Sequence, residues 1–288
     1  MARARIDQDE CMARRFSFLD RSVTIVGIVN VTPDSFSDGG RFVEHDLAVA
    51  HALQLAADGA HLIDVGGEST RPGATPVSPD DELRRVIPVI ETLASRGIAV
   101  SIDTRRAVVA SAAIAAGARV VNDVTGLRDH AMREAVAAAG VPAIVMHAPS
   151  ADMAETHRHA GYTDVVAEVE HFLAAQVDVA RRAGVAEVVV DPGIGFGKSL
   201  DDNLTILGRL QEFVGLGCPI MVGASRKRFL GTLTGVPQAA DRDAASVAAH
   251  LIAVQRGATA IRVHDVAGHA QALAVWTAVG SAGVDERV

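Results

Sequence analysis

Polar residues that could bind a substrate recur at one kind of place in this sequence, directly after short apolar runs rich in Val and Ile. If these runs are strands of one parallel sheet, the polar residues meet where the strands end, and this is the edge that binds ligands in such sheets. A purely structural sheet needs no charged or amide groups there, so the pattern predicts an active site. The set comprises Asn30, Gly66 to Arg71, Asp103, Asn122, Asp123, Met146, His147, Asp191, Ser225 to Lys227, Arg262, His264 and Asp265.

Four of these residues carry the groups that a flat nitrogen heterocycle requires. Asp103 and Asp191 are carboxylates, which pair at two points with an amidine-like edge such as that of a pterin. Asn122 adds an amide, and Lys227 can donate to a ring carbonyl. Met146 would form an apolar floor. Taken alone, Asp103 could instead only cap the helix that follows it.

Asn30 opens a loop over residues 31–40, whose small polar residues suit a mobile lid around one aromatic residue. The Asn side-chain oxygen is a hard ligand, which suits Mg²⁺ that also holds waters and phosphate oxygens. The alternative is an Asn that only caps a turn. The sequence thus offers Asn30 as a candidate magnesium ligand.

The segment Gly66 to Gly73 combines three glycines, two hydroxyls and the guanidinium of Arg71. Exposed backbone N–H groups and the planar donors of an arginine are what a phosphate or a carboxylate needs. We expect this loop to wrap an anion, although loops of this composition often have no ligand.

Arg262 and His264 lie two residues apart, so their side chains share one side of the last predicted strand. Phosphate sites in barrels often lie around the last two strands, which favours a leaving pyrophosphate between these residues and Asn30. His157 and His159 have no acidic or Cys partner at metal-ligand spacing, and we interpret them as solvated loop residues.

Three well-known motifs are approached but not matched. The segment Asp191 to Ser199 has Pro192 where a P-loop requires its first Gly, and it lacks the dinucleotide fingerprint. We interpret it as a tight loop that fixes Asp191 and Phe196. The segment Gly223 to Lys227 has Lys at the last Gly position of a nucleophile elbow, which argues against a serine hydrolase.

Apolar runs and helical spacing alternate along the whole chain, which predicts a single-domain α/β protein, a (β/α)8 barrel. Gly residues end several of the helices, as expected just before the next strand. We expect residues 1–20 to be a disordered leading segment, 21–280 the barrel and 281–288 a tail. The expected strands are Val23–Val29, His61–Val65, Ala99–Ile102, Arg119–Val121, Ala143–Met146, Glu187–Val190, Ile220–Val222 and Ala260–Val263. The expected helices include Asp46–Ala57, Pro79–Ser95, Arg105–Ala116, Asp164–Ala183, Asp201–Phe213 and Ala244–Arg256.

Composition narrows the functional class further. Aromatic residues are only 3% of the 288 residues, so a parallel-sheet core of Ala, Val, Ile and Leu is favoured over an immunoglobulin-like sandwich. The net charge of −8 gives no footprint for nucleic acid. Cys11 and Cys218 form neither a disulfide framework nor a zinc motif, and no signal peptide or membrane span is evident. We expect a cytoplasmic protein without nucleic-acid or membrane partners.

With these residues in place, the chain resembles the dihydropteroate synthase family from about Val23 to Val275. The motifs that carry the resemblance are Gly27 to Gly39, Gly67 to Gly73, Asp191 to Lys198, Ser225 to Arg228 and Arg262 to Asp265. Their shared order implies a pterin-binding barrel. The implied reaction joins dihydropterin pyrophosphate to p-aminobenzoate by an SN1-like displacement, with Mg²⁺ as cofactor and a homodimer as the assembly.

The resemblance also implies a role for each matched residue. It places the pterin among residues that come from several different strands. It places the pyrophosphate and the metal between Asn30 and the last strand. Asp34 on the lid would stabilise the cation. The implied pterin residues are Asp103, Asn122, Met146, Asp191, Phe196 and Lys227; those for p-aminobenzoate are Phe36, Thr70, Arg71, Pro72 and Ser225; those for pyrophosphate are Asn30, Arg262 and His264; and the catalytic set is Asp34, Lys227, Arg262 and His264.

Two rival interpretations share this barrel. A pterin-dependent methyltransferase would use the same carboxylates but would need neither a pyrophosphate site nor a long lid. A catalytically silent paralogue would bind pterin without turnover. The loop after His147 departs from the family pattern, since residues 148–153 read Ala-Pro-Ser-Ala-Asp-Met. This loop leaves room for a divergent paralogue.

Overall fold

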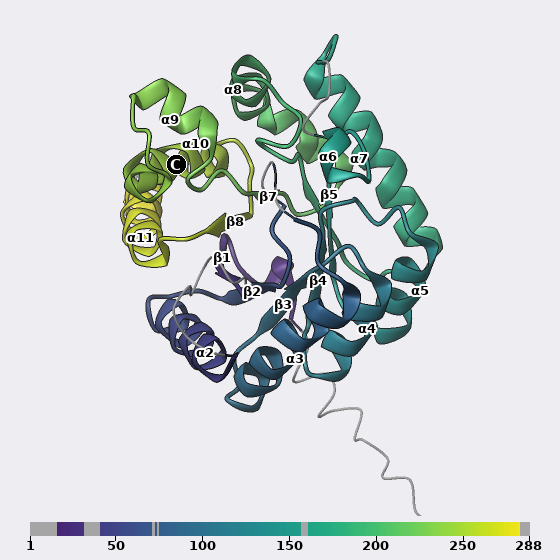
Figure 1. The fold of residues 1–288 in the computed structure, drawn as a ribbon. Helices are drawn as coiled ribbons and strands as arrows, with labels where there is room; N and C mark the ends of the chain where they lie inside the picture. Colours follow the sequence, from purple (N-terminus) through teal and green to yellow (C-terminus); the bar gives the residue numbers. More distant parts are fainter. Residues whose placement is uncertain (1–15, 32–40, 71–72, 74, 157–160, 283–288) are drawn as a thin grey trace, which may run out of the picture.

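The chain folds into eight parallel strands surrounded by helices, as a computed structural model shows (Figure 1). The structure describes residues 16–31, 41–70, 73, 75–156 and 161–282. The strands are β1 (Thr24–Asn30), β2 (Leu62–Gly66), β3 (Val100–Asp103), β4 (Val120–Asp123), β5 (Ala143–Met146), β6 (Val188–Asp191), β7 (Met221–Val222) and β8 (Ala260–Val263). The α-helices are α2 (Arg41–Ala57), α3 (Pro79–Ser95), α4 (Ala107–Ala115), α5 (His130–Ala139), α6 (Met153–Thr156), α7 (Val165–Arg182), α8 (Leu200–Gly208), α9 (Arg228–Thr234), α10 (Asp243–Gln255) and α11 (Val266–Ala282).

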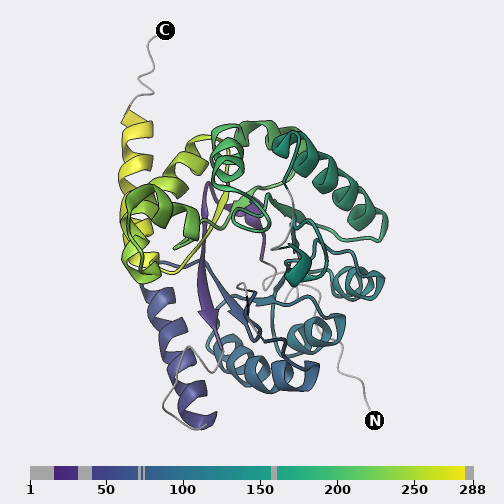
Figure 2. The same ribbon diagram turned by 45° about the horizontal axis from the view of Figure 1, so that its top comes forward.

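The sheet closes on itself into a barrel. Its order is β6-β5-β4-β3-β2-β1-β8-β7, and a parallel bridge between Val190 and Ile220 joins the two ends. The backbone N–H of Val190 also donates to the carbonyl of Pro219 at 2.9 Å. The helices form a ring outside the strands in both views (Figure 2). The predicted (β/α)8 barrel is therefore confirmed.

The predicted strand positions are close to the observed ones, with a consistent offset. Ala143–Met146 and Ala260–Val263 match β5 and β8, but four other strands begin and end one residue later than expected. Asn30, Asp103 and Asp191 are thus the last residues of their strands rather than the first loop residues. This matters because a strand residue has a fixed inward or outward direction.

Two helices differ most from the expectation, and one of them is α2, which begins at Arg41 rather than at Asp46. The helix expected over Asp201–Phe213 is instead α8 followed by a 3₁₀ turn over Leu210–Leu216, while α3 matches its predicted range. Ser199 caps α8, and Asp202 completes a capping box with it, which explains why this helix begins at Leu200. Among the described helices, none is both long and apolar enough to cross a bilayer.

An apolar layer fills the end of the barrel that faces away from the loops after the strands. Phe16 and Phe18 are buried in this layer, so the expectation of disorder up to residue 20 is wrong for residues 16–20. Ser17 caps the 3₁₀ turn Phe18–Asp20 by accepting from the N–H of Leu19. The strand residues of the layer are Val26, Leu62, Val120, Ile144, Val189, Met221 and Ala260.

Candidate active site

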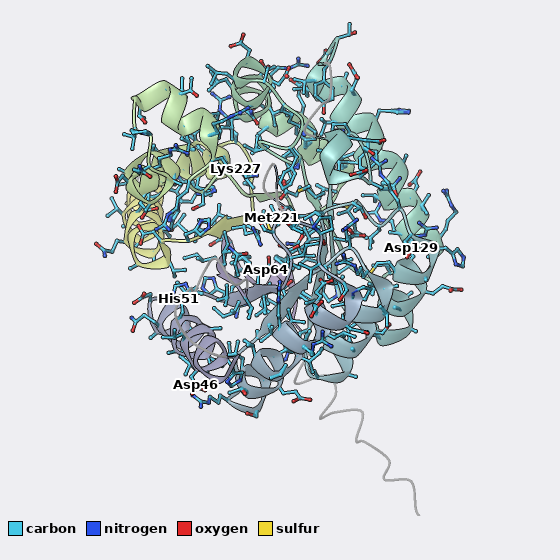
Figure 3. The ribbon with its side chains drawn as sticks, viewed as in Figure 1. Asp46, His51, Asp64, Asp129, Met221 and Lys227 are labelled. Atoms are coloured by element: carbon cyan, nitrogen blue, oxygen red, sulfur yellow. The ribbon has the colours of Figure 1, made fainter. Side chains whose placement is uncertain are left out.

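The site residues lie one step above this apolar layer, because residues two apart on a strand face the same way. Leu62 is followed by Asp64, Val120 by Asn122, and Ala260 by Arg262. In the same way, Ile144 precedes Met146 and Val189 precedes Asp191. Asp64 and Met221 lie in the middle of the ring of strands, whereas Asp46 and Asp129 lie at its periphery (Figure 3). The barrel thus positions a layer of polar side chains directly above the apolar layer.

Four side chains of this layer form a hydrogen-bonded group, called here the central cluster: Asp64, Asp103, Asn122 and Arg262. Arg262 donates from Nε to Asp64 Oδ2 at 2.6 Å and from Nη2 to Asp103 Oδ2 at 2.7 Å. Asn122 Nδ2 donates to Asp64 Oδ2 at 3.0 Å. These residues come from β2, β3, β4 and β8, so the predicted convergence of separate strands is observed.

The central cluster is a buried group with more negative than positive charge. Burial raises the pKa of Asp103; Arg262 opposes this rise and Asp64 adds to it. Burial would lower the pKa of Arg262, but Asp64 and Asp103 raise it above its usual value. A cationic ligand group would therefore be stabilised beside these two carboxylates.

Asp64 was missed in the sequence because it lies inside an apolar run that was interpreted only as strand core. Its side chain is fully buried, and its Oδ1 has no hydrogen-bond partner among the described residues. A carboxylate in the inward register of an otherwise apolar strand is the signal that could have found it. The alternative for Asp103 is also settled: the N-cap of α4 is Arg106, so Asp103 does not cap that helix.

Asp191 lies on the same mouth, across β7 from the central cluster. A Cβ on Gly223 would lie 3.7 Å from Cβ of Arg262 and 3.9 Å from Oδ2 of Asp191. Burial raises the pKa of Asp191, while Lys227, the N–H of Gly193, Lys198 and Arg262 oppose this rise. Asp191 therefore joins the residues around Arg262, as the sequence predicts.

Lys227 lies over the loop that follows β6. Its Nζ donates to the carbonyl of Ile194 and lies 4.5 Å from the centre of the Phe196 ring, within cation–π range. Burial lowers the pKa of Lys227 to about 8, with Asp191 opposing and Arg262 adding to the effect. Lys227 is thus a partly buried cation beside Asp191.

Lys198 is a buried lysine of this loop, and the sequence interpretation assigned it no role. Its Nζ donates to the carbonyls of Gly193 at 2.9 Å and Phe196 at 3.1 Å, and lies 3.0 Å from His147 Nδ1. Burial lowers the pKa of Lys198 to about 7, with Asp191 opposing. Gly193 also donates to Asp191 Oδ1 at 2.7 Å. The segment Asp191 to Lys198 is therefore the tight loop that the sequence predicts.

A substitution of Gly193 tests whether this loop is packed as described. Its φ of +68° is in the left-handed region, and a Cβ there would collide with the carbonyl oxygen of His147. We expect Gly193→Ala to cost about 3 kcal/mol of the free energy of unfolding in urea, from backbone strain plus overpacking. The matched control is Gly140→Ala, where φ is +64° but no atom lies within 4 Å of the new Cβ, and about 1 kcal/mol is expected. Equal losses in the two variants would contradict the packing argument.

Met146, the residue expected to form an apolar floor, lies in a small apolar cluster. Met146 is buried and packs with Val124, Ala148 and the partly buried Phe196. These residues come from β5, the loops after β4 and β5, and the loop after β6, so they line the mouth next to Asn122 and Asp191. Asp123 beside Asn122 has a structural role, because its carboxylate accepts from Thr125 and from the N–H of Leu127.

Ser225 and His264 join the loops after β7 and β8. Ser225 Oγ lies 2.9 Å from His264 Nδ1 and accepts the backbone N–H of His264 at 3.2 Å. In a serine hydrolase triad the serine instead contacts Nε2, while Nδ1 faces a carboxylate. This geometry agrees with the sequence argument against a hydrolase. It also couples the hydroxyl of Ser225 to the imidazole of His264.

The remaining predicted residues divide into two groups. Asn30 ends β1 in register with Gly66, and Thr70 is partly buried in the loop after β2. Asp34, Phe36, Arg71, Pro72, His157 and His159 lie outside the described residues. In the part of the chain that the structure describes, no group of three His, Cys, Asp or Glu side chains could hold a metal ion.

A network of ion pairs between side chains anchors the loop after β2. Glu68 accepts from Arg105, from Arg106 and from the N–H of Val77 at 3.1 Å. Arg106 also pairs with the buried Glu82. Burial alone would raise the pKa of Glu68, but the hydrogen bonds from Arg105 and Arg106 lower it to about 2. The network therefore ties the segment that carries Thr70 to α3 and α4.

We expect Glu68→Gln to lower the free energy of unfolding by about 2 kcal/mol near neutral pH, because charged hydrogen bonds are lost. A carboxylate with a lowered folded pKa stabilises the protein above its ordinary value of 4.5, and this contribution disappears as the pH falls towards about 2. The difference between parent and variant should therefore shrink over that window in pH-dependent urea unfolding. Glu134→Gln at an exposed site should show no such convergence. A difference that is independent of pH would contradict the assignment.

Comparisons with known proteins agree with this geometry. A family model described as "Pterin binding enzyme" matches residues 26–264. Dihydropteroate synthase of Mycobacterium leprae is 48% identical over 261 residues, covering 88% of this chain and 92% of that protein.

Solved structures agree as well. Xanthomonas albilineans dihydropteroate synthase with 4-aminobenzoic acid matches with a TM-score of 0.87 and 50% identity, covering 94% of this chain and 97% of that one. The Thermus thermophilus enzyme in complex with 6HMPPP matches with a TM-score of 0.79 and 48% identity, covering 90% and 95%. The chain therefore belongs to the pterin-binding enzyme family and, within it, to the dihydropteroate synthases.

Proposed function

We propose that this chain condenses 6-hydroxymethyl-7,8-dihydropterin pyrophosphate with p-aminobenzoate, giving 7,8-dihydropteroate and pyrophosphate. The observation that carries the proposal is the mouth of the barrel, where Arg262 joins Asp64 to Asp103 and lies close to Asp191. Such a site combines carboxylates for a pterin with a guanidinium for a departing diphosphate. Similar enzymes with ligands of both halves of this reaction support the choice of substrates.

The pterin would lie over Met146 and Phe196, edge-on to the buried carboxylates. Asp191 is suited to the amidine-like edge, because it can accept from a ring N–H and an exocyclic amine together. Asn122 and Asp103 would contact the opposite side, and Lys227 would donate to the ring carbonyl. Every one of these side chains is held by a strand end or by the tight loop after β6. The pocket is therefore organised before the ligand arrives.

The diphosphate would lie between the ends of β1 and β8. Arg262 and His264 would stabilise the negative charge that develops on it. The amide oxygen of Asn30 is a hard donor at the mouth, which fits Mg²⁺ with phosphate oxygens and waters as the other ligands. When bound, the ion would supply Lewis-acid stabilisation of the leaving diphosphate.

The chemistry needs little proton transfer, because an aryl amine is neutral at ordinary pH. The C–O bond to pyrophosphate would break first, with its electron pair leaving on the diphosphate and positive charge remaining on the pterin methylene. The amine nitrogen then forms the new C–N bond and loses one proton to solvent. Asp34 and the buried carboxylates would offset the cation. Ser225, Thr70, Phe36, Arg71 and Pro72 would hold p-aminobenzoate for this attack.

The experiment is a turnover assay of the purified chain with Mg²⁺, dihydropterin pyrophosphate and p-aminobenzoate, in which dihydropteroate and pyrophosphate are measured separately. We expect equal amounts of the two products. Pterin binding without product would instead favour the silent paralogue. Methyl transfer from a methylated pterin to a corrinoid protein would favour the methyltransferase, which would leave the Arg262 and His264 side of the site without a use.

We also propose a cytoplasmic homodimer without nucleic-acid or membrane partners. The outer face of α11 presents the exposed apolar side chains Val275, Trp276 and Val279, which suit a contact with a second copy. Sedimentation of the parent should give a dimer, and Val279→Asp should shift it towards monomer. A monomeric parent would remove this part of the proposal.

A further inference from the structure

Helix α10 carries three polar residues on one face, and all three contact the turn after β7. They are Asp243, Ser246 and His250, at helical spacings that bring side chains to the same side. Ser246 Oγ accepts the N–H of Arg226 at 2.9 Å, and His250 Nε2 accepts the N–H of Ala224 at 3.0 Å. The turn between Ala224 and Lys227 is therefore held through its backbone, on both sides of Ser225.

The same turn contains a conformation that needs such support. Arg226 has a φ of +59°, which is rare for a residue with a side chain. Its guanidinium forms two hydrogen bonds with Asp243, at 2.7 and 2.8 Å, and its carbonyl accepts from Arg242 at 3.0 Å. The strained residue thus separates Ser225 from Lys227, and the N-terminal half of α10 fixes it.

His250 extends this support to the neighbouring loop through a second buried histidine. Its Nδ1 lies 2.8 Å from Nε2 of His269 on α11, and His269 Nδ1 contacts the carbonyl of Asp265 at 2.5 Å. In the arrangement of protons that links these contacts, His250 Nε2 accepts from Ala224 and the carbonyl of Asp265 accepts from His269. Both rings are then neutral, and each donates from Nδ1.

This arrangement is more than the filling of a core. His250 and His269 are 1% and 2% exposed, and a buried imidazole is costly unless its nitrogens are hydrogen-bonded. Leu or Phe could fill the same volume, but neither could join the N–H of Ala224 to the carbonyl of Asp265. The two ends of this chain are the residues next to Ser225 and His264, which contact each other in the site at 2.9 Å.

We propose that His250 and His269 are positioning residues, which hold the loop of Ser225 and the loop of His264 in one fixed relation. The inference rests on the proposed function, in which Ser225 faces p-aminobenzoate and His264 faces the departing diphosphate. The buried histidine pair would then align the side of the site that receives the amine with the side that releases the diphosphate. Neither histidine would contact a substrate.

The test uses two variants of His250 in the full-length protein, each with an amide that mimics one ring nitrogen. His250→Gln places an amide oxygen near the position of Nε2 and keeps an acceptor for Ala224. His250→Asn places its amide near Nδ1 and keeps the contact with His269, but leaves Ala224 without its acceptor. Val254→Ala on the same helix is the matched control for a simple loss of packing.

We expect His250→Asn to raise the exchange rate of the Ala224 amide proton at least 100-fold and KM for p-aminobenzoate at least tenfold, with a smaller change in kcat. His250→Gln should stay within about threefold of the parent in both. His269→Ala should raise the inhibition constant of pyrophosphate at least fivefold. The reason is that the hydrogen bonds of His250 and His269 hold the conformation of two loops, whereas the fold as a whole depends on them much less.

Two results would overturn the proposal. One is equal behaviour of the Asn and Gln variants, and the other is a KM that follows the unfolding temperature in the same way as in Val254→Ala. The amide exchange of Ala224 can be measured without turnover. If the parent protein makes no dihydropteroate, the proposed function fails, and the exchange measurement still decides whether His250 fixes the turn.

Discussion

Replacing Asp191 with Asn is expected to weaken the binding of dihydropterin pyrophosphate at least 100-fold. Burial at the mouth raises the pKa of this carboxylate and Lys227, Lys198 and Arg262 oppose the rise, so the N–H donors of a bound pterin would further favour its charged form. An amide of the same shape can still accept from the N–H of Gly193. Its NH₂ group, however, would face one of the two N–H donors of the amidine-like edge, so that contact becomes repulsive. Charged hydrogen bonds are worth about 1.5 to 3 kcal/mol each, and the loss of two corresponds to two or more powers of ten.

The measurement is calorimetric titration of the pterin substrate into parent and variant. Asp201→Asn, an exposed change at the start of α8, is the matched control and should bind like the parent. Circular dichroism and urea unfolding would verify that Asp191→Asn keeps its fold. Pterin affinity that stays within threefold of the parent would show that the heterocycle lies elsewhere.

Replacing Arg262 with Met is the second large change, and it should affect both stability and turnover. Arg262 is the cation that pairs with Asp64 and Asp103, and removing one partner of a buried ion pair costs about 3 to 5 kcal/mol. The site would also lose its guanidinium for the diphosphate, so kcat/KM should fall by at least three powers of ten, a size typical for lost transition-state stabilisation.

The pH dependence of this variant has a definite sign. Arg262 opposes the rise that burial causes in the pKa of Asp103, so its removal raises that pKa further. A carboxylate whose folded pKa is raised is favourable below its unfolded pKa, and the protein loses stability as the pH rises through the folded value. The variant should therefore lose more stability at about pH 8 than at about pH 5. Arg119→Met, at the other end of the barrel, should lose little at either pH. Equal stability of parent and Arg262→Met would contradict the central cluster as described.

Much of this architecture could be predicted from residue patterns. Alternating apolar runs and Ala-rich helical segments predict the barrel, and β5 and β8 were found at their observed bounds. The convergence of Asp103, Asn122, Asp191 and Arg262 was also predicted, because the ends of parallel strands in a barrel share one mouth. What determines these features is local: strand periodicity and strand order.

The parts that escaped prediction depend on contacts between residues far apart in the chain. Asp64 looks like strand core until the register of β2 directs it inward, towards Arg262 at a separation of 198 residues. Lys198 received no role from the sequence, because only the fold brings its ammonium to His147 and to the carbonyls of its own loop. His250 and His269 lie in helices whose Ala-rich pattern gives no sign of a buried polar pair. Phe16 and Phe18 precede the barrel, and only its closure provides the apolar layer that they cover.

The most direct test of the central claim is a crystal structure of this chain with dihydropterin pyrophosphate and Mg²⁺. We expect the bicyclic ring above Met146 with its amine edge on Asp191, and the diphosphate at Arg262, His264 and Asn30. A ring bound at the Phe16 end of the barrel, or a diphosphate remote from Arg262, would contradict the account.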